Sequence, residues 1–183
     1  MNPSDPIPTD PRAKPDPAER EEAAQRPDFR FAFSHPWHAV SLFGGAGALR
    51  PGPGTWGTLA AWLTFVGGSR LWGEPVWIAL ILVGLYFGAW AAQRTGQALG
   101  KPDHGAIVID EVVAFWIVLL LTPSTLAWQA AAFVVFRFFD ITKPPPIRQL
   151  DRRFKNGVGV MLDDLLAGFY TLVVIAIGVR VLA

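Results

Sequence analysis

The stretch "DDLLAGFYTLVVIAIGVRVLA" (163–183) decides the fold class that we expect for this chain. After two adjacent aspartates it runs through residues 165–183 with Arg180 as its single charge. A helix needs about 20 predominantly apolar residues to cross the hydrocarbon core of a bilayer. The length of the run and the absence of apolar–polar alternation favour a helix over a strand. The stretch therefore predicts a membrane-spanning helix that begins beside two carboxylates.

The composition fits a small integral membrane protein better than a soluble one. Hydrophobic residues make up 51% of the 183 residues and charged residues 17%, whereas soluble domains usually carry roughly 25% charged residues. The length allows one domain, and we expect the lipid bilayer to surround it. The absence of cysteine excludes disulfides, thiolate metal sites and cysteine catalysis. A formal net charge of +1 gives no reason to expect nucleic acid as a partner.

Residues 1–30 differ in composition from the rest of the chain. They combine charged residues of both signs with prolines and have almost no large apolar side chain. Such a segment cannot bury enough apolar surface to offset the conformational entropy that folding costs. We therefore expect a disordered cytosolic tail over residues 1–30 and a membrane-embedded helical domain over residues 31–183.

Four more apolar segments lie between the tail and the last helix. They are 55–68, 75–92, 111–121 and 125–139. Thr55 is expected to cap the first of them, because threonine is a favoured N-cap residue. The third and fourth segments are short for a full crossing. Together the five segments predict an all-α fold, a polytopic membrane bundle of about four or five apolar helices.

Basic residues predict which loops face the cytosol. The loop 67–75 has only Arg70 and the turn 122–124 has no basic residue, whereas segments 93–103 and 143–155 are richer in lysine and arginine. Cytosolic loops of membrane proteins carry the excess of these residues. Five crossings that start with the amino terminus inside place both rich segments in the cytosol. We therefore expect a multi-pass protein whose polar motifs all face the cytosol.

Five carboxylates lie where apolar helices are expected to begin or end. They are Asp110, Glu111, Asp140, Asp163 and Asp164. One acid at a helix start is explained by capping and by the helix dipole. Adjacent acids, however, repel each other, and the dipole disfavours an anion at a carboxyl end, where Asp140 is expected. A salt bridge to Arg137, three residues earlier, is the simpler explanation for Asp140.

Convergence of these acids on one membrane face predicts a divalent cation site. Clustered carboxylates repel one another unless one or two divalent cations lie among them, and Mg²⁺ prefers carboxylate and water oxygens as ligands. Metal ions beside anion-binding groups at a cytosolic membrane surface are typical of phosphate-ester chemistry on a lipid headgroup.

Two further segments supply possible anion-binding groups. The segment "FGGAGALRPGPGTWGTLAAW" (43–62) is rich in glycine and leads into a helix start, so its backbone near Gly54 and Thr55 could bind phosphate with help from Arg50. A plain glycine–proline connector is the simpler alternative. The basic segment 143–155 could orient a phosphate, attract anionic lipid, or only mark the cytosolic side.

Several long motifs carry a resemblance to a known family. They are "HPWH" (35–38), "RPGPGTWGTLAA" (50–61), "HGAIVIDE" (104–111), "FRFFDITKPPPIRQLDRR" (136–153) and "GVGVMLDDLLAG" (157–168). Over nearly all of residues 35–175 the chain resembles the phosphatidylglycerophosphatase A family. The resemblance implies Mg²⁺-dependent hydrolysis of phosphatidylglycerophosphate to phosphatidylglycerol and inorganic phosphate. It also implies an all-helical protein of the bacterial cytoplasmic (inner) membrane with its active site facing the cytosol.

The resemblance also assigns roles to individual residues. It implies that the five acids bind the metal and carry the catalysis. It implies that the basic residues of the fourth motif bind the headgroup phosphate; these are Arg137, Lys143, Arg148 and Arg152. A metal-activated water and an aspartyl-phosphate intermediate are both open as mechanisms.

A competing class is a cation-coupled transporter or a structural membrane protein. Acids inside a helix bundle can mark a cation path. That class predicts carboxylates near the middle of facing helices, whereas the acids of this chain lie near the expected helix ends. The pattern D-G-x₂-A-R-x₈-G-x₃-D-x₃-D of lipid-headgroup transferases is absent from the sequence.

Overall fold

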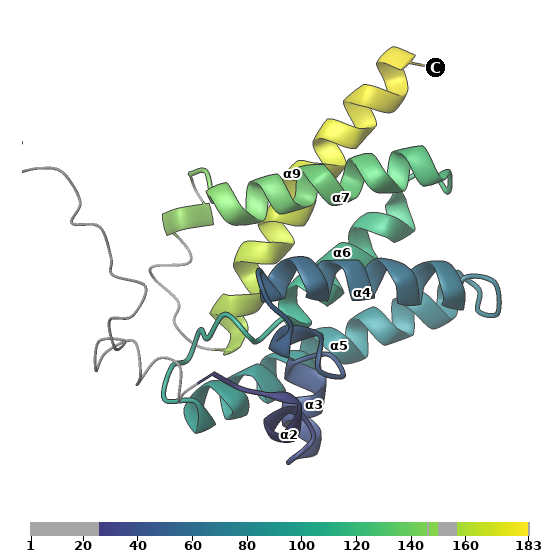
Figure 1. The fold of residues 1–183 in the computed structure, drawn as a ribbon. Helices are drawn as coiled ribbons and strands as arrows, with labels where there is room; N and C mark the ends of the chain where they lie inside the picture. The colour runs from purple at the N-terminus through teal and green to yellow at the C-terminus, as the bar shows by residue number, and fades with distance from the viewer. Residues whose placement is uncertain (1–25, 146, 150–156, 183) are drawn as a thin grey trace, which may run out of the picture.

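The computed structural model of the chain describes residues 26–145, 147–149 and 157–182. These residues form helices joined by loops and contain no strand (Figure 1). The helices are α2 (Phe29–Ala32), α3 (Pro36–Ser41), the 3₁₀ turn η1 (Ala46–Ala48), α4 (Pro53–Gly68), α5 (Glu74–Ala98), α6 (Ile109–Leu121), α7 (Leu126–Thr142) and α9 (Gly157–Leu182). The expected all-α class is confirmed. Most of the expected tail, residues 1–25, lies outside the described residues.

Helix α6 is the centre of the fold. It contacts α4, α5, α7 and α9, and most of its side chains are buried, including Val112, Phe115 and Leu119. Burial on every side explains why its sequence reads as a continuous apolar run. Its 13 residues extend only about 20 Å, which is less than the roughly 30 Å of a hydrocarbon core. Contacts with the neighbouring helices therefore determine the position of α6.

Helices α5 and α9 are the two described helices that are long and apolar enough to cross a membrane. Their candidate spans are Glu74–Ala98 and Gly159–Leu182, and the carboxyl end of α9 projects beyond the other helices (Figure 1). Both expose large apolar side chains, such as Leu82 and Tyr86 on α5 and Ile177 on α9. Apolar surface of this extent marks contact with lipid or protein. The bundle of four or five crossing helices stays a prediction.

Helices α4, α6 and α9 begin earlier than the sequence predicted, α6 at Ile109 instead of Glu111. Helix α4 begins at Pro53 after Gly52, whose φ of 70° is left-handed, so the expected capping role of Thr55 is wrong. Proline is well suited to the first position of a helix, because it lacks the N–H that would be unsatisfied there. Helix α9 begins at Gly157, where a Cβ atom would lie 2.1 Å from the Ala89 carbonyl oxygen. Glycine at that position lets the start of α9 lie against α5.

Candidate active site

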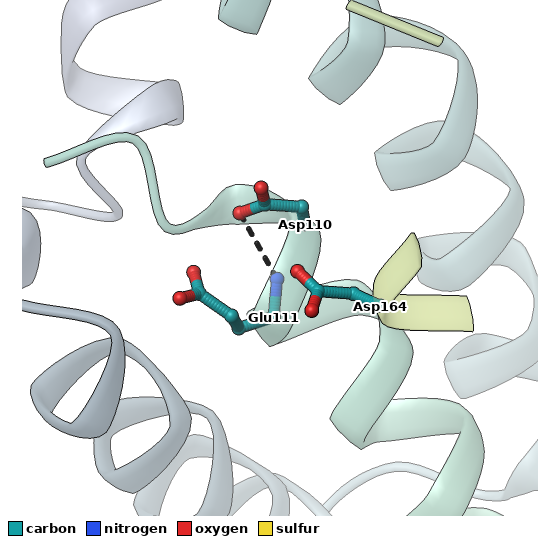
Figure 2. Close-up of side chains that lie close together, drawn as sticks. All are labelled: Asp110, Glu111 and Asp164. Carbon is teal, nitrogen blue, oxygen red and sulfur yellow. Dashed lines mark hydrogen bonds between the residues drawn. The ribbon is translucent and has the colours of Figure 1, made fainter. Parts of the chain in front are cut away.

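Three carboxylates from two helices meet in the interior of the fold. Asp110 and Glu111 lie in the first turn of α6, and Asp164 lies in the second turn of α9. One oxygen from each lies within 4.8 Å of the others (Figure 2). Asp110 and Asp164 are only 6% and 4% exposed. Burying charged groups together is costly unless a cation or a proton compensates them.

Helix capping explains some of these acids but not all of them. The Asp110 Oδ1 atom accepts a hydrogen bond of 3.0 Å from the Glu111 backbone N–H, as expected for an acid at a helix start. Asp163 and Asp164 occupy the interior of α9, because that helix begins at Gly157. The favourable interaction with the dipole is confined largely to the first turn. Neither aspartate therefore owes its place to capping.

Arg137 of α7 joins a fourth acid to the cluster. Its Nη1 atom lies 2.6 Å from Asp140 Oδ2 and 3.6 Å from Glu111 Oε1. The salt bridge between Asp140 and Arg137, which the sequence offered as the simpler explanation, is thus present. Asp140 also acts electrostatically on Glu111 and Asp164, so the ion pair does not remove it from the acidic cluster.

Lys143 forms an ion pair with the fifth predicted acid. It follows the last residue of α7 with a left-handed φ of 41°, and its Nζ atom pairs with Asp163 Oδ2. Asp163 in turn acts electrostatically on Asp110. Among the described residues, Asp110, Glu111 and Asp164 lie together, Arg137 links Asp140 to Glu111, and Lys143 at the end of α7 pairs with Asp163.

The start of α4 closes one side of the cluster. A Cβ atom on Gly54 would lie 2.1 Å from Glu111 Oε1 and 3.0 Å from both terminal nitrogens of Arg137. An added side chain at this position would displace the Glu111 carboxylate. The lack of a side chain at Gly54 therefore lets the start of α4 lie close to Glu111 and Arg137.

Thr58 is a site residue that the sequence reasoning missed. It is fully buried, donates its hydroxyl hydrogen to the Gly54 carbonyl oxygen at 2.8 Å, and accepts from Arg137 Nη1 at 3.3 Å. Its spacing of four residues from Gly54 puts both on one face of α4, and this spacing is the signal that could have found it.

Two buried polar atoms of the site lack a hydrogen-bond partner within the described part of the chain. They are Glu111 Oε2 and Arg137 Nε. Buried polar atoms are nearly always satisfied, and an unsatisfied one calls for an explanation such as an ion. An orphaned carboxylate oxygen beside two further buried carboxylates fits the oxygen ligands that Mg²⁺ prefers. Asp110, Glu111 and Asp164 could therefore hold this ion.

The other predicted phosphate ligands are less closely tied to the acids. Thr55 is exposed beside Gly54, and Arg148 is exposed and donates to the Thr142 carbonyl oxygen at 3.3 Å. Arg50 is exposed and lies near His104. Arg152 lies outside the described residues. Their roles in phosphate binding stay predictions.

The loop before α6 contains a histidine outside the acidic cluster. His104 accepts a hydrogen bond of 3.2 Å at Nδ1 from the Ala106 backbone N–H. Burial lowers the pKa of His104, and the positive charges of Lys101 and Arg50 lower it further. Its neutral form is thereby favoured, and its bond to Ala106 helps to shape the approach to α6.

We expect Thr58→Val to reduce turnover about tenfold. Valine preserves the volume but removes the acceptor of Arg137, and a hydrogen bond to a charged group contributes about 1.5–3 kcal/mol. Loss of part of that energy in the transition state corresponds to about tenfold. The readout is the release of phosphate, the product that the sequence resemblance implies, at saturating substrate.

Thr171→Val is the matched control for this substitution. Thr171 is also fully buried and donates to the carbonyl oxygen four residues earlier, that of Ala167 at 2.7 Å. It should lose similar stability with little change in turnover. Equal effects of both variants on turnover would assign Thr58 a purely structural role.

Comparison with known proteins gives the family. The family described as phosphatidylglycerophosphatase A matches residues 39–179. The Haemophilus influenzae protein named phosphatidylglycerophosphatase A is 40% identical over 148 residues, which are 80% of this chain and 90% of the relative. The Escherichia coli protein of the same name is 38% identical over 145 residues, which are 76% of this chain and 81% of the relative.

A further relative carries a different name. The Bacteroides thetaiotaomicron protein, provisionally named a phosphatidylinositol-3-phosphatase, is 38% identical over 135 residues, which are 68% of this chain and 82% of the relative. No solved structure matches the chain. The family match spans most of the sequence and includes all five acids and Gly54. This chain belongs to the phosphatidylglycerophosphatase A family.

Proposed function

We propose that this phosphatase hydrolyses phosphatidylglycerophosphate to phosphatidylglycerol and inorganic phosphate, with Mg²⁺, at the cytosolic face of the bacterial inner membrane. The observation that carries the proposal is the buried group of Asp110, Glu111 and Asp164, whose oxygens lie within 4.8 Å of one another. The names of the Haemophilus and Escherichia relatives support the substrate. The Bacteroides name also denotes a lipid phosphatase, so a lipid phosphomonoester is the shared chemistry.

In this proposal the metal ion binds to the three buried carboxylates. Asp110, Glu111 and Asp164 would hold the ion, and the unsatisfied Glu111 Oε2 atom supports this assignment. Mg²⁺ bound there would supply electrostatic stabilisation of the phosphoryl oxygens in the transition state, an effect of several kcal/mol.

The remaining charged residues set the electrostatics of the pocket. Arg137 pairs with Asp140 and Glu111, and Lys143 pairs with Asp163. These pairs hold the acids in place and reduce their mutual repulsion. In this proposal the guanidinium of Arg137, with its buried Nε donor, also faces the phosphate. Arg50, Gly54, Thr55, Lys143, Arg148 and Arg152 are the further candidates for that contact.

The apolar surfaces and the basic loops support the proposed membrane placement. The exposed apolar faces of α5 and α9 would contact lipid tails. The basic segments 93–103 and 143–155 favour a cytosolic position for the end of the bundle that carries the acids. A lipid substrate could then present its headgroup to the acids without leaving the bilayer.

Phosphate release by the purified protein in detergent micelles tests the proposal. We expect release from phosphatidylglycerophosphate to fall to background with a chelator and to return when Mg²⁺ is added back, because the carboxylates need the cation to accept an anionic substrate. Phosphatidylinositol 3-phosphate and glycerol 3-phosphate serve as comparison substrates. Full turnover in the chelator would refute the metal requirement, and a clear preference for phosphatidylinositol 3-phosphate would reassign the substrate.

A further inference from the structure

A cavity lies at the opposite end of α6 from Asp110 and Glu111. It has a volume of about 590 Å³ and is formed by the end of α4, the start of α5, the end of α6 and the start of α7. Ligand pockets commonly measure about 300–1,000 Å³. Asp110 and Glu111 lie in the first turn of α6, whereas Leu119, Leu120 and Thr122 line this cavity. The cavity is therefore separate from the candidate active site.

The wall of the cavity combines opposite charges with buried polar groups. Arg70 and Glu74 both line it, and both are exposed. Deeper in the wall lie Thr122 and Gln129, each 7% exposed. The Oε1 atom of Gln129 accepts from Trp62 Nε1 at 2.8 Å. This bond orients the side-chain amide of Gln129, whose nitrogen is a donor.

Aromatic and aliphatic side chains complete the cavity. Phe65, Trp72, Trp77, Leu119 and Leu120 line it, and Trp77 packs against Phe65 and Trp72 at ring-centroid distances of 4.6 and 5.8 Å. The Nε1 atom of Trp77 is buried and has no hydrogen-bond partner among the described residues. A buried donor without a partner costs about 1–3 kcal/mol. An acceptor oxygen bound at this end could satisfy that donor after a small shift of the ring.

We propose that this cavity binds one zwitterionic phospholipid of the bilayer. Arg70 would bind the phosphate, Glu74 the ammonium group, and the apolar wall part of an acyl chain. Tryptophan residues are common at the level of lipid headgroups, and Trp72 is 46% exposed at the rim, next to Leu71 at 80%. The presence of both charges in the lining favours a zwitterionic headgroup over an anionic one, because Glu74 would repel a net negative charge. The proposal rests on the membrane placement above but not on the phosphatase chemistry.

Native mass spectrometry of the full chain tests this proposal without substrate or Mg²⁺. The delipidated protein in detergent is titrated with phosphatidylethanolamine, with phosphatidylglycerol, and with the soluble headgroup glycerophosphoethanolamine. We expect one retained phosphatidylethanolamine, about tenfold weaker retention of phosphatidylglycerol, and little retention of the soluble headgroup. Equal retention of the two lipids, or retention of the headgroup alone, would overturn the proposal.

Three variants locate the bound lipid. Arg70→Gln and Trp77→Phe should each weaken retention of phosphatidylethanolamine about tenfold, whereas Arg180→Gln, an exposed arginine of α9 outside the lining of this cavity, should not. Arg70 is exposed, so its substitution tests the proposal even if Trp77→Phe impairs folding. Unchanged retention in Arg70→Gln would refute this site. Lipid retention is measured without substrate turnover. The test of the cavity therefore stays valid even if the protein fails to hydrolyse phosphatidylglycerophosphate.

Discussion

Asp164→Asn is expected to lower phosphate release at least about 1,000-fold while the protein still inserts and folds. Asparagine keeps the shape of the side chain and removes the anion, and metal ions supply several kcal/mol of transition-state stabilisation. Asp164 lies in the second turn of α9, so no capping interaction is lost. The change also removes one of several clustered negative charges. The melting temperature of the metal-free protein should therefore stay the same or rise.

The measurement is phosphate release across a Mg²⁺ titration, with the melting temperature followed in parallel. Asp103→Asn is the matched control, because Asp103 is an exposed acid outside the cluster and should turn over like the unaltered protein. Glu111→Gln and Asp140→Asn should behave like Asp164→Asn if all belong to one site. Turnover close to that of the unaltered protein in Asp164→Asn would remove this residue from the proposed metal site.

Convergence of the acids was the part of the site that sequence reasoning could predict. Two carboxylates precede one apolar segment, one follows another and two precede the last, so a helical bundle brings them to a common end. In the structure Arg137 pairs with Glu111 and Asp140, and Lys143 pairs with Asp163. Local charge and hydropathy patterns carry this information, because a charged residue beside an apolar helix needs a partner.

The helix boundaries were predicted less accurately than the convergence of the acids, for a physical reason. The sequence placed the start of the last helix at the aspartates, whereas α9 begins at Gly157. Glycine has a low intrinsic helix propensity, so residues 157–162 read as a flexible approach. Tertiary contact decides instead, because the start of α9 packs against Ala89 of α5. The role of Thr58 was hidden for a similar reason, since its partner Arg137 lies 79 residues later.

The short central helix explains how so apolar a helical fold can hold so many acids. Asp110 and Glu111 begin α6, and α4, α5, α7 and α9 surround it. Protein groups rather than lipid therefore face these carboxylates. In a bilayer such acids are tolerated when they face the bundle interior and have partners. Burial of α6 thus stabilises the fold and, in the proposed membrane placement, keeps the acids away from lipid tails.

Gly54→Ala is expected to lower turnover at least about 100-fold without destabilising the protein. The added Cβ would lie 2.1 Å from Glu111 Oε1, so the carboxylate must move away from its neighbours. The atom displaced is the end of a flexible side chain, and alanine favours a helix by about 1 kcal/mol over glycine. Folding should therefore tolerate the change. Catalysis should not, because a displacement of about 1 Å at an active site can cost roughly 100-fold.

Gly67→Ala on the same helix separates the two effects. A Cβ atom at Gly67 meets nothing within 4 Å, so this variant should gain helix stability and keep full turnover. Melting temperature and Mg²⁺-dependent phosphate release are measured for both variants. We expect the Gly54→Ala protein to melt normally, to need more Mg²⁺ and to turn over slowly. That result would show that the start of α4 fixes the position of Glu111. Normal turnover would mean that Glu111 can move without loss, and that its place beside Gly54 is a matter of packing alone.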